Sequence, residues 1–216
     1  MDTGRKEQVP GSEKKGADRK IMRRRTACRE SPATIGVMGV DHGVGVTHFS
    51  IMLAGYEGAK LRKKVALVEL NQSGHFREIQ KAYEGREEEA RKFRILDTVY
   101  YRDSSPQELT EILNEGFECI ILDLGCDYRK NETEFLRSSK KIIVGSLCEW
   151  KKAGYVGFFE EHKGEGDRWE YLSMPALPGE IRDMKSASGV RLRSIPFEPD
   201  PFVVRSENFG FFRQLV

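Results

Sequence analysis

Long apolar runs, paired cysteines and secretory features are all missing from this chain of 216 residues. No apolar run approaches the roughly 18 residues that a membrane-spanning helix needs, so the sequence predicts no such helix. The basic N-terminal stretch is not followed by an apolar segment, so we expect no secretory signal. The cysteines are not spaced as metal ligands, and we expect them to be ordinary thiols of a cytoplasmic protein. They are Cys28, Cys119, Cys126 and Cys148.

The charge of the chain is concentrated at its N-terminus. Residues 1–30 hold ten lysines and arginines against five acids, a net charge of +5, which leaves −3 for the rest of a chain whose total is +2. Few apolar residues occur there, so we expect a disordered tail over 1–32 and one folded domain over 33–216. Alternatively, the tail binds an anionic membrane surface or nucleic acid. The mildly acidic remainder argues against a specific nucleic-acid interface.

Apolar runs alternate with helical patterns through the rest of the chain. Several of these runs are continuous, as in Cys119–Leu122 and Ile142–Val144, which is typical of strands covered on both faces. The alternation predicts an α/β fold, a doubly wound and mostly parallel sheet with helices on both faces. The expected strands are Thr34–Val40, Lys64–Leu70, Phe93–Tyr101, Phe117–Leu124, Lys141–Leu147, Trp169–Met174 and Val190–Ile195. The expected helices are Thr47–Arg62, Phe76–Lys92, Ser105–Asn114, Asn131–Ser139, Trp150–His162, Gly179–Ala187 and Asn208–Leu215.

The loop over residues 40–48 carries the strongest functional signal. It leaves the first expected strand, contains Gly43 and Gly45, and enters the first expected helix. Glycines let successive backbone N–H groups curve around an anion, and the helix adds its own free N–H groups and its dipole. The alternative is a glycine-rich turn that only connects strand to helix. If the loop binds nucleotide, the residues that contact it are Gly43, Val44, Gly45, Val46, Thr47 and His48.

This loop resembles the deviant Walker A loop of the MinD/ParA family, x-K-G-G-x-G-K-T-T. Gly43, Val44, Gly45 and Thr47 match that pattern. The resemblance implies a P-loop NTPase fold whose cofactors are ATP and magnesium, with Thr47 as a magnesium ligand.

The same loop departs from the family at three positions. Asp41 replaces the signature lysine, His42 replaces the first glycine and Val46 replaces the P-loop lysine. Losing one lysine–phosphate contact at ~4 Å forfeits up to about 4 kcal/mol where solvent screens partly. An Asp41 side chain that faces the pocket would add repulsion of similar size. We therefore expect ATP hydrolysis to be very slow or absent, while weak nucleotide binding stays open.

Two further segments extend the resemblance. Val65–Phe76 is similar to the family's second strand and switch, D-x-D-P-Q-G, with Glu69 and Asn71 at the two aspartate positions. The resemblance places Asn71 where the attacking water is oriented, but an amide cannot accept its proton. Ile120–Gly125 resembles a Walker B strand, which makes Asp123 the second magnesium ligand. The alternative is an acid that caps a loop at the strand end.

Ile195–Pro201 resembles the I-P-x-D-P segment that passes by the nucleotide base in MinD-like proteins. That resemblance makes Pro196 and Glu198 nucleotide-binding candidates, whereas the alternative is a plain proline-rich loop. The four motifs follow the family order over residues 34–202. Within the superfamily, the chain looks most similar to TadZ/CpaE-like proteins, which serve Flp/Tad pilus loci.

The function implied is that of a pseudo-ATPase: a cytoplasmic scaffold, peripheral at the membrane, that docks a pilus or secretion partner and forms a homodimer. One alternative is a working ATPase that uses a cation from elsewhere in the chain. Another is a membrane-surface or nucleic-acid binder that acts through the basic tail.

Two other groups of residues are candidates for sites. The histidines near the loop lack zinc-site spacing with an acid, so we expect no metal there. The aromatic residues after the fifth expected strand should pack in the core or against a partner helix rather than stack on a base. These residues are His42, His48 and His75, and Trp150, Tyr155, Phe158 and Phe159.

Overall fold

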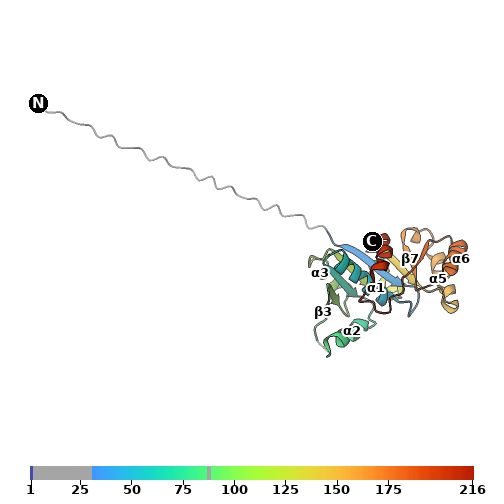
Figure 1. Cartoon of the computed structure of the whole chain (residues 1–216), viewed down its shortest axis with the longest axis horizontal. Coiled ribbons are helices and arrows are strands. Elements are labelled where there is room, and N and C mark those ends of the chain that lie inside the picture. Colours follow the sequence, from blue (N-terminus) through green and yellow to red (C-terminus); the bar gives the residue numbers. More distant parts are fainter. Residues whose placement is uncertain (2–30, 87–88) are drawn as a thin grey trace.

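A single mixed sheet organises the molecule. The computed structural model describes residue 1, residues 31–86 and residues 89–216, so most of the expected basic tail lies outside the described residues. Within them, eight strands pair in the order β3-β4-β2-β5-β1-β6-β7-β8. All neighbours are parallel except β3 and β4. Figure 1 shows β3 and α2 at one end of this arrangement and α5 and α6 at the other.

The elements follow the predicted alternation of strands and helices. The strands are β1 (Ala33–Gly39), β2 (Val65–Glu69), β3 (Lys92–Ile95), β4 (Thr98–Tyr101), β5 (Cys119–Asp123), β6 (Lys140–Gly145), β7 (Glu170–Ser173) and β8 (Leu192–Ser194). The α-helices are α1 (Val46–Gly55), α2 (His75–Glu84), α3 (Pro106–Ile112), α4 (Tyr128–Arg137), α5 (Glu149–Glu161), α6 (Pro178–Ser188) and α7 (Phe209–Leu215). A π-helical turn, η1 (Tyr56–Lys60), continues α1, and η2 (Gly166–Arg168) and η3 (Ser206–Asn208) are short 3-10 turns.

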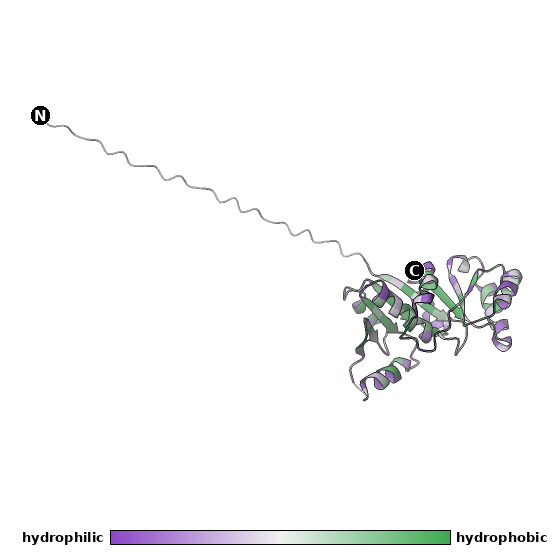
Figure 2. Ribbon diagram, viewed as in Figure 1, coloured by the Kyte–Doolittle hydropathy of each residue, from purple (hydrophilic) through white to green (hydrophobic). Residues whose placement is uncertain are grey.

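Successive residues of the central strands belong to two separate cores. Ile35 and Val37 of β1 pack with α1 and α7, whereas Met38 packs with the core of α3, α4, α5 and α6. The same alternation along β5 sends Ile121 to the first core and Ile120 to the second. This confirms the doubly wound sheet, because both faces of the central strands β1, β2, β5 and β6 are buried. In Figure 2 the central strands are coloured hydrophobic and the helices mix both classes of residue.

Two predicted elements are wrong. The single strand expected over Phe93–Tyr101 is an antiparallel hairpin of β3 and β4. Its turn places Leu96 at φ 50°. The turn contains no glycine, asparagine or proline that would predict it from the sequence. The helix expected over Phe76–Lys92 ends at Glu84, because Gly85 adopts φ 75° and closes the last turn.

The predicted start of α3 is confirmed. The Ser105 side chain accepts a hydrogen bond from the Glu108 N–H, and the Glu108 side chain accepts one from the Ser105 N–H. Pro106 occupies the first turn, where its missing N–H costs nothing. Among the described residues, no helix is long and apolar enough to span a bilayer.

Candidate functional site

The loop after β1 has the backbone of an anion cradle. Gly43 adopts φ 68° and Gly45 adopts φ 86°, and Gly45 is the N-cap of α1. A Cβ at Gly43 would meet nothing within 4 Å, so this part of the loop is open. A Cβ at Gly45 would collide with the Met174 sulfur. The loop therefore needs glycine at position 45 for both its dihedral angle and its close packing.

The residue at the P-loop lysine position is part of the core. The Val46 side chain is only 8% exposed and packs with the cluster beneath α1. A Cβ placed on Gly39 would lie 2.7 Å from Val46 Cγ2, which shows how closely this valine meets β1. The loop therefore presents a methyl group to the interior at this position and no ammonium group to the cleft.

The predicted magnesium ligands are brought together. The Thr47 hydroxyl donates to Asp123 Oδ2 at 2.6 Å, and the Asn71 amide donates to Asp123 Oδ1 at 2.6 Å. The Gly125 N–H also donates to Asp123 Oδ1, at 3.2 Å. Gly125 adopts φ 65°, and a Cβ there would lie 2.6 Å from Asn71 Cβ. The turn after β5 thus makes room for the Asn71–Asp123 contact.

Burial controls the ionisation of Asp123. The residue is fully buried, and this burial raises the pKa of its carboxyl from 3.8 to about 6. The hydrogen bonds from Thr47, Gly125 and Asn71 lower the pKa and limit the rise. At neutral pH Asp123 is therefore ionised and acts only as an acceptor.

His75 is a site residue that the sequence did not assign to the nucleotide. It is the first residue of α2, and its Nδ1 lies 3.2 Å from Thr47 Oγ1. Thr47 has one hydroxyl proton and gives it to ionised Asp123, so His75 must donate its Nδ1–H to Thr47 Oγ1. The tautomer of His75 is thereby fixed by its neighbours.

The Thr47–Asp123 pair keeps part of its acceptor capacity for a magnesium ion. Both oxygens of Asp123 already accept N–H or O–H donors, and one lone pair of Thr47 accepts the His75 N–H. Magnesium needs oxygen ligands in near-ideal octahedral geometry at about 2.0–2.1 Å. The two expected ligands are adjacent, and one lone pair of Thr47 Oγ1 and one of Asp123 Oδ2 are not used by donors of this chain, so these are the residues that would hold magnesium.

Glu69, at the first aspartate position of the switch, holds the backbone between β2 and α2 through hydrogen bonds. Its fully buried carboxylate accepts hydrogen bonds from the Ser73 hydroxyl at 2.9 Å, the Phe76 N–H at 3.3 Å and the Asp103 N–H at 3.2 Å. Asn71 Oδ1 accepts from the Ser73 N–H at 2.8 Å. Glu69 and Asn71 together hold the segment between β2 and α2 in place.

Asp41, the second lost lysine position, is paired with a lysine from another element. Lys151 Nζ, in the first turn of α5, lies 2.8 Å from Asp41 Oδ2 and also donates to the His42 carbonyl oxygen. The Lys151 ammonium, followed by the His42 N–H, holds the pKa of Asp41 below its usual range. The expected repulsion from Asp41 is therefore offset by a cation that the motif does not contain.

A cleft of about 760 Å³ lies in front of the loop. The segments after β1, β2 and β5 line it, as expected for the carboxyl ends of parallel strands. Lys130, in the first turn of α4, lines it too, with its Nζ 2.8 Å from Gln72 Oε1. Lys130 and Lys151 were not predicted as site residues. The usable signal was their place in the first turn after a central parallel strand.

The predicted base-binding segment lies beside the cleft. Pro196 and Glu198 are not among the described residues that line it. His48 does line it, and its Nε2 lies 2.8 Å from the Glu198 carbonyl oxygen. The Glu198 carboxylate points the other way and accepts from Arg205 Nε at 2.8 Å and Asn208 Nδ2 at 2.5 Å.

The histidine and aromatic candidates have different surroundings in the structure. No group of three or more His, Cys, Asp or Glu side chains among residues 31–86 and 89–216 could hold a metal ion. His42 Nδ1 lies 3.3 Å from Cys126 Sγ at the edge of the cleft. Tyr155 and Phe159 are buried in the second core, whereas Trp150 is 82% exposed.

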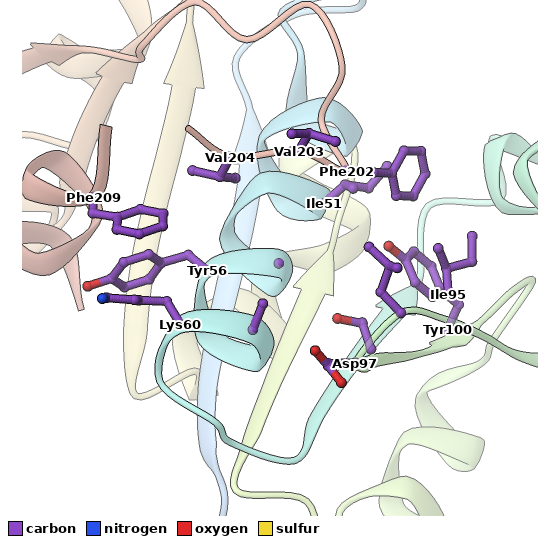
Figure 3. Close-up of a pocket in the computed structure, with 14 residues that line it drawn as sticks. Ile51, Tyr56, Lys60, Ile95, Asp97, Tyr100, Phe202, Val203, Val204 and Phe209 are labelled. Carbon is purple, nitrogen blue, oxygen red and sulfur yellow. The ribbon is translucent and has the colours of Figure 1, made fainter. Parts of the chain in front are cut away.

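A second cavity, of about 290 Å³, lies at the far end of α1. It is apolar, and η1, the β3–β4 hairpin and the segment before α7 enclose it (Figure 3). Lys60 lies at its edge with Nζ 5.1 Å from the centre of the Phe209 ring. The exposed side chains Leu96 and Val203 belong to the same groove. The molecule thus has a polar cleft and an apolar groove at opposite ends of one helix.

Comparison with solved structures defines the class of fold. A plasmid partition protein from Borrelia burgdorferi bound to AMPPNP matches with a TM-score of 0.60 at 11% identity, over 86% of this chain and 97% of that one. The MinC:MinD cell division complex of Aquifex aeolicus matches with a TM-score of 0.58 at 16% identity, over 84% and 95%. FlhF complexed with GTP and Mg²⁺ matches with a TM-score of 0.55 at 13% identity, over 87% and 75%.

The chain has the α/β fold of MinD/ParA-type P-loop proteins. At these identities the similarity establishes the fold alone. No family model matches the sequence. No curated protein matches it either.

Proposed function

We propose that this protein is a pseudo-ATPase: a scaffold that binds a nucleotide weakly, does not hydrolyse it, and localises or assembles a protein partner. The observation that carries the proposal is the phosphate loop itself. Its glycines keep an open cradle, while Val46 is buried in the core and Asp41 is paired with Lys151. A transition state for phosphoryl transfer would find no lysine on the loop to stabilise its charge.

The partner and the setting follow from the resemblance of the sequence. TadZ/CpaE-like proteins serve pilus assembly, so we propose a component of a pilus or secretion apparatus as the partner, at the cytoplasmic side of the membrane. The solved MinC:MinD complex shows that one protein with a similar fold binds a protein partner. The apolar groove with exposed Leu96 and Val203 supports a protein contact here, and homodimer formation belongs to the same proposal.

The test measures binding and turnover together. A fluorescent ATP analogue should bind with a dissociation constant in the micromolar range or weaker, and phosphate release should equal the protein-free blank. Val46→Lys should raise affinity about tenfold, because a charge-assisted contact is worth roughly 1.5–3 kcal/mol. Its matched control, Val46→Met, adds a side chain of similar length at the same position without the positive charge and should not raise affinity. Steady phosphate release that Thr47→Ala abolishes would overturn the proposal.

A working ATPase with substitute cations is the second candidate. Lys130 and Lys151 favour it, because both place an ammonium group at the loop or the cleft. In that case wild type would release phosphate, and Lys130→Gln would lose that activity while Arg129→Gln would keep it. The expected result for a pseudo-ATPase is no turnover in all three proteins.

The third candidate function is binding of an anionic surface by the basic tail, which can be tested separately from nucleotide binding. Binding to anionic vesicles or to DNA that falls with salt and disappears when residues 1–32 are removed would assign it to the tail. Unchanged salt-dependent binding after the deletion would dismiss this role.

A further inference from the structure

The loops that lead into the central strands form a surface at the end of the sheet opposite the phosphate loop. The strands β4, β2, β5, β1 and β6 are parallel neighbours in this order, so the segments before them lie side by side. At a spacing of about 4.8 Å the row of strands is roughly 20 Å wide. We call this surface the amino-end face. It consists of residues 60–64 before β2, residues 96–97 before β4, residues 115–118 before β5, residues 31–33 at the start of β1 and residues 137–141 before β6.

Cations are concentrated on the amino-end face. Residues 60–64 hold four lysines and arginines and residues 137–141 hold three, and neither loop contains an acid, although residues 31–216 carry a net charge of −3. Lys60, Arg62 and Lys64 are exposed, and none of them forms an ion pair with a carboxylate in the described part of the chain. The folded part of the protein therefore has a cationic surface that the net charge of the chain does not reveal.

The acids of the same face are fewer and are mostly engaged by the protein. Glu57 is buried and its carboxylate lies 2.6 Å from Lys63 Nζ. Glu118 accepts the backbone N–H of residue 64 at 2.9 Å. Glu115 forms an ion pair with a lysine of β3, and Asp97 stays exposed. These contacts leave the positive charge of the face in excess.

The basic N-terminal segment joins the molecule at this face. β1 starts at Ala33, whose N–H donates to the Glu118 carbonyl oxygen at 3.0 Å. The side chain of Glu118 in turn contacts the backbone of Lys64. Residues 1–30 carry a net charge of +5, and most of them lie outside the described residues. Their point of attachment brings a second cationic element to the end of the sheet that already holds residues 60–64.

Two exposed leucines lie among these cations. Leu61 is 39% exposed and Leu96 is 63% exposed. Leu96 adopts φ 50° and Arg62 adopts φ 60°, conformations that residues other than glycine rarely adopt. The turn at Leu96 is held against η1, since a Cβ on Gly58 would lie 3.3 Å from Asp97 Cβ. Backbone strain of this kind persists where the surroundings fix it, and it clusters at functional sites.

The combination of leucines and cations fits a lipid bilayer better than a nucleic acid. At a bilayer, apolar side chains enter the boundary between headgroups and acyl chains, while lysines and arginines stay at the anionic headgroups. Proteins that bind single-stranded nucleic acid without sequence preference offer aromatic side chains for stacking. The exposed aromatic residues of the described chain lie elsewhere, at Tyr83, Trp150 and Phe197, so the amino-end face offers none.

We propose that the amino-end face docks on an anionic phospholipid bilayer, with Leu61 and Leu96 inserted at the interface and with residues 60–64 and the basic tail on the headgroups. The inference goes beyond the proposed function, because it concerns the other end of the sheet and stands even if the cleft binds no nucleotide. In this orientation the cleft and Trp150, at the carboxyl ends of the strands, face away from the membrane.

The first experiment measures sedimentation of the full-length protein with vesicles of phosphatidylcholine that contain phosphatidylglycerol, against phosphatidylcholine alone. Wild type should bind only the anionic vesicles, and less as salt screens the charges. Arg62→Asn with Lys64→Gln should weaken binding about 25-fold, at about fivefold per cation. Asparagine is used at position 62 because it tolerates φ 60°. The matched control, Arg129→Gln with Lys152→Gln, removes two cations from the first turns of α4 and α5, at the opposite end of the sheet, and should bind as wild type does.

The leucines distinguish a bilayer from other anionic partners. Leu96→Gln should weaken vesicle binding about tenfold, because the side chain no longer enters the apolar boundary. Its matched control, Leu177→Gln, changes a leucine that is 69% exposed at the N-cap of α6 and should have no effect. Melting curves by circular dichroism check that all variants are folded.

Tryptophan fluorescence reports which end of the molecule touches the bilayer. The emission of Leu96→Trp should shift to the blue on anionic vesicles and should be quenched by brominated lipid. Trp150 is 82% exposed at the opposite end, and its emission in wild type should not change.

Three results would overturn the inference. Equal vesicle binding by wild type and by the variant of Arg62 and Lys64 would leave the tail as the only membrane contact. A blue shift of Trp150 emission in wild type would place the opposite end on the bilayer. No binding to anionic vesicles at low salt, with or without binding to duplex DNA, would refute the lipid surface itself. None of these results bears on nucleotide binding in the cleft, which the titration with labelled nucleotide tests separately.

Discussion

Short motifs predicted that two segments contact a nucleotide: the phosphate loop over residues 40–48 and the proline-rich segment Ile195–Pro201. In the structure the two segments have different positions relative to the cleft. The loop lines the cleft, and Thr47 points its hydroxyl at Asp123 on the cleft side. The segment reaches the cleft only through the His48–Glu198 carbonyl contact, while its carboxylate is bound to Arg205 and Asn208. A motif match predicts the course of the local backbone well. It does not predict the partners of a side chain, which can come from any part of the fold.

Two buried acids, Asp123 in contact with Thr47 of the loop and Glu198 in the proline-rich segment, should respond to pH in opposite directions. Asp123 should show the larger effect. Its folded pKa of about 6 lies above the unfolded value of 3.8. The folded state therefore holds its proton longer, and stability is lost as pH rises from about 4 to 6, by roughly 2–3 kcal/mol. Asp123→Asn removes this loss. Urea unfolding at pH 4.5, 5.5 and 7 should show the variant gaining on wild type as pH rises.

An unchanged difference between Asp123→Asn and wild type across that pH range would break the comparison. It would mean that Asp123 does not titrate between pH 4 and 6, and that its buried contacts balance the cost of burial.

Glu198 should show the reverse slope. Burial raises its pKa, but the Arg205 N–H, the Asn208 side chain and the Arg205 guanidinium outweigh burial and hold the pKa below its usual range. Its stabilising contribution is therefore present above the unfolded pKa and is lost as pH falls through the folded value. Glu198→Gln should cost about 1–2 kcal/mol at pH 7 and less in acid, since the Arg205 side chain is 52% exposed and solvent weakens the pair.

The same Glu198→Gln protein sharpens the comparison through ligand binding. Its affinity for labelled ADP should equal that of wild type, because the carboxylate faces the C-terminal segment. A loss of affinity above threefold without a change in the melting temperature would place Glu198 in the binding site.

The smallest effect concerns the pair on the rim of the loop. Lys151→Ala leaves the Asp41 charge uncompensated beside the cleft, and we expect affinity for the ADP analogue to fall about threefold, with a stability change below about 1 kcal/mol because Asp41 is half exposed. Asp41→Asn in the same protein should restore affinity. In this double-mutant cycle, equal losses in the single and double variants would show that Lys151 does not act through Asp41.

The sequence by itself determined the sheet and its two covered faces, because continuous apolar runs such as Cys119–Leu122 have to be buried on both sides. It also determined the glycine loop and the Ser105–Glu108 capping box, whose signals lie within a few neighbouring residues. The β3–β4 hairpin escaped prediction, since the turn residue at φ 50° is Leu96, and leucine does not favour φ above zero.

Only the tertiary structure decided which charges meet at the site. Lys151 lies 110 positions from Asp41 in sequence, Lys130 lies 58 from Gln72, and His75 lies 28 from Thr47. Parallel strands bring their carboxyl ends to one edge of the sheet, so helices that are distant in the chain start side by side there. Periodicity and spacing report local neighbours, whereas the pairing of a carboxylate with a cation depends on where the sheet order places each helix.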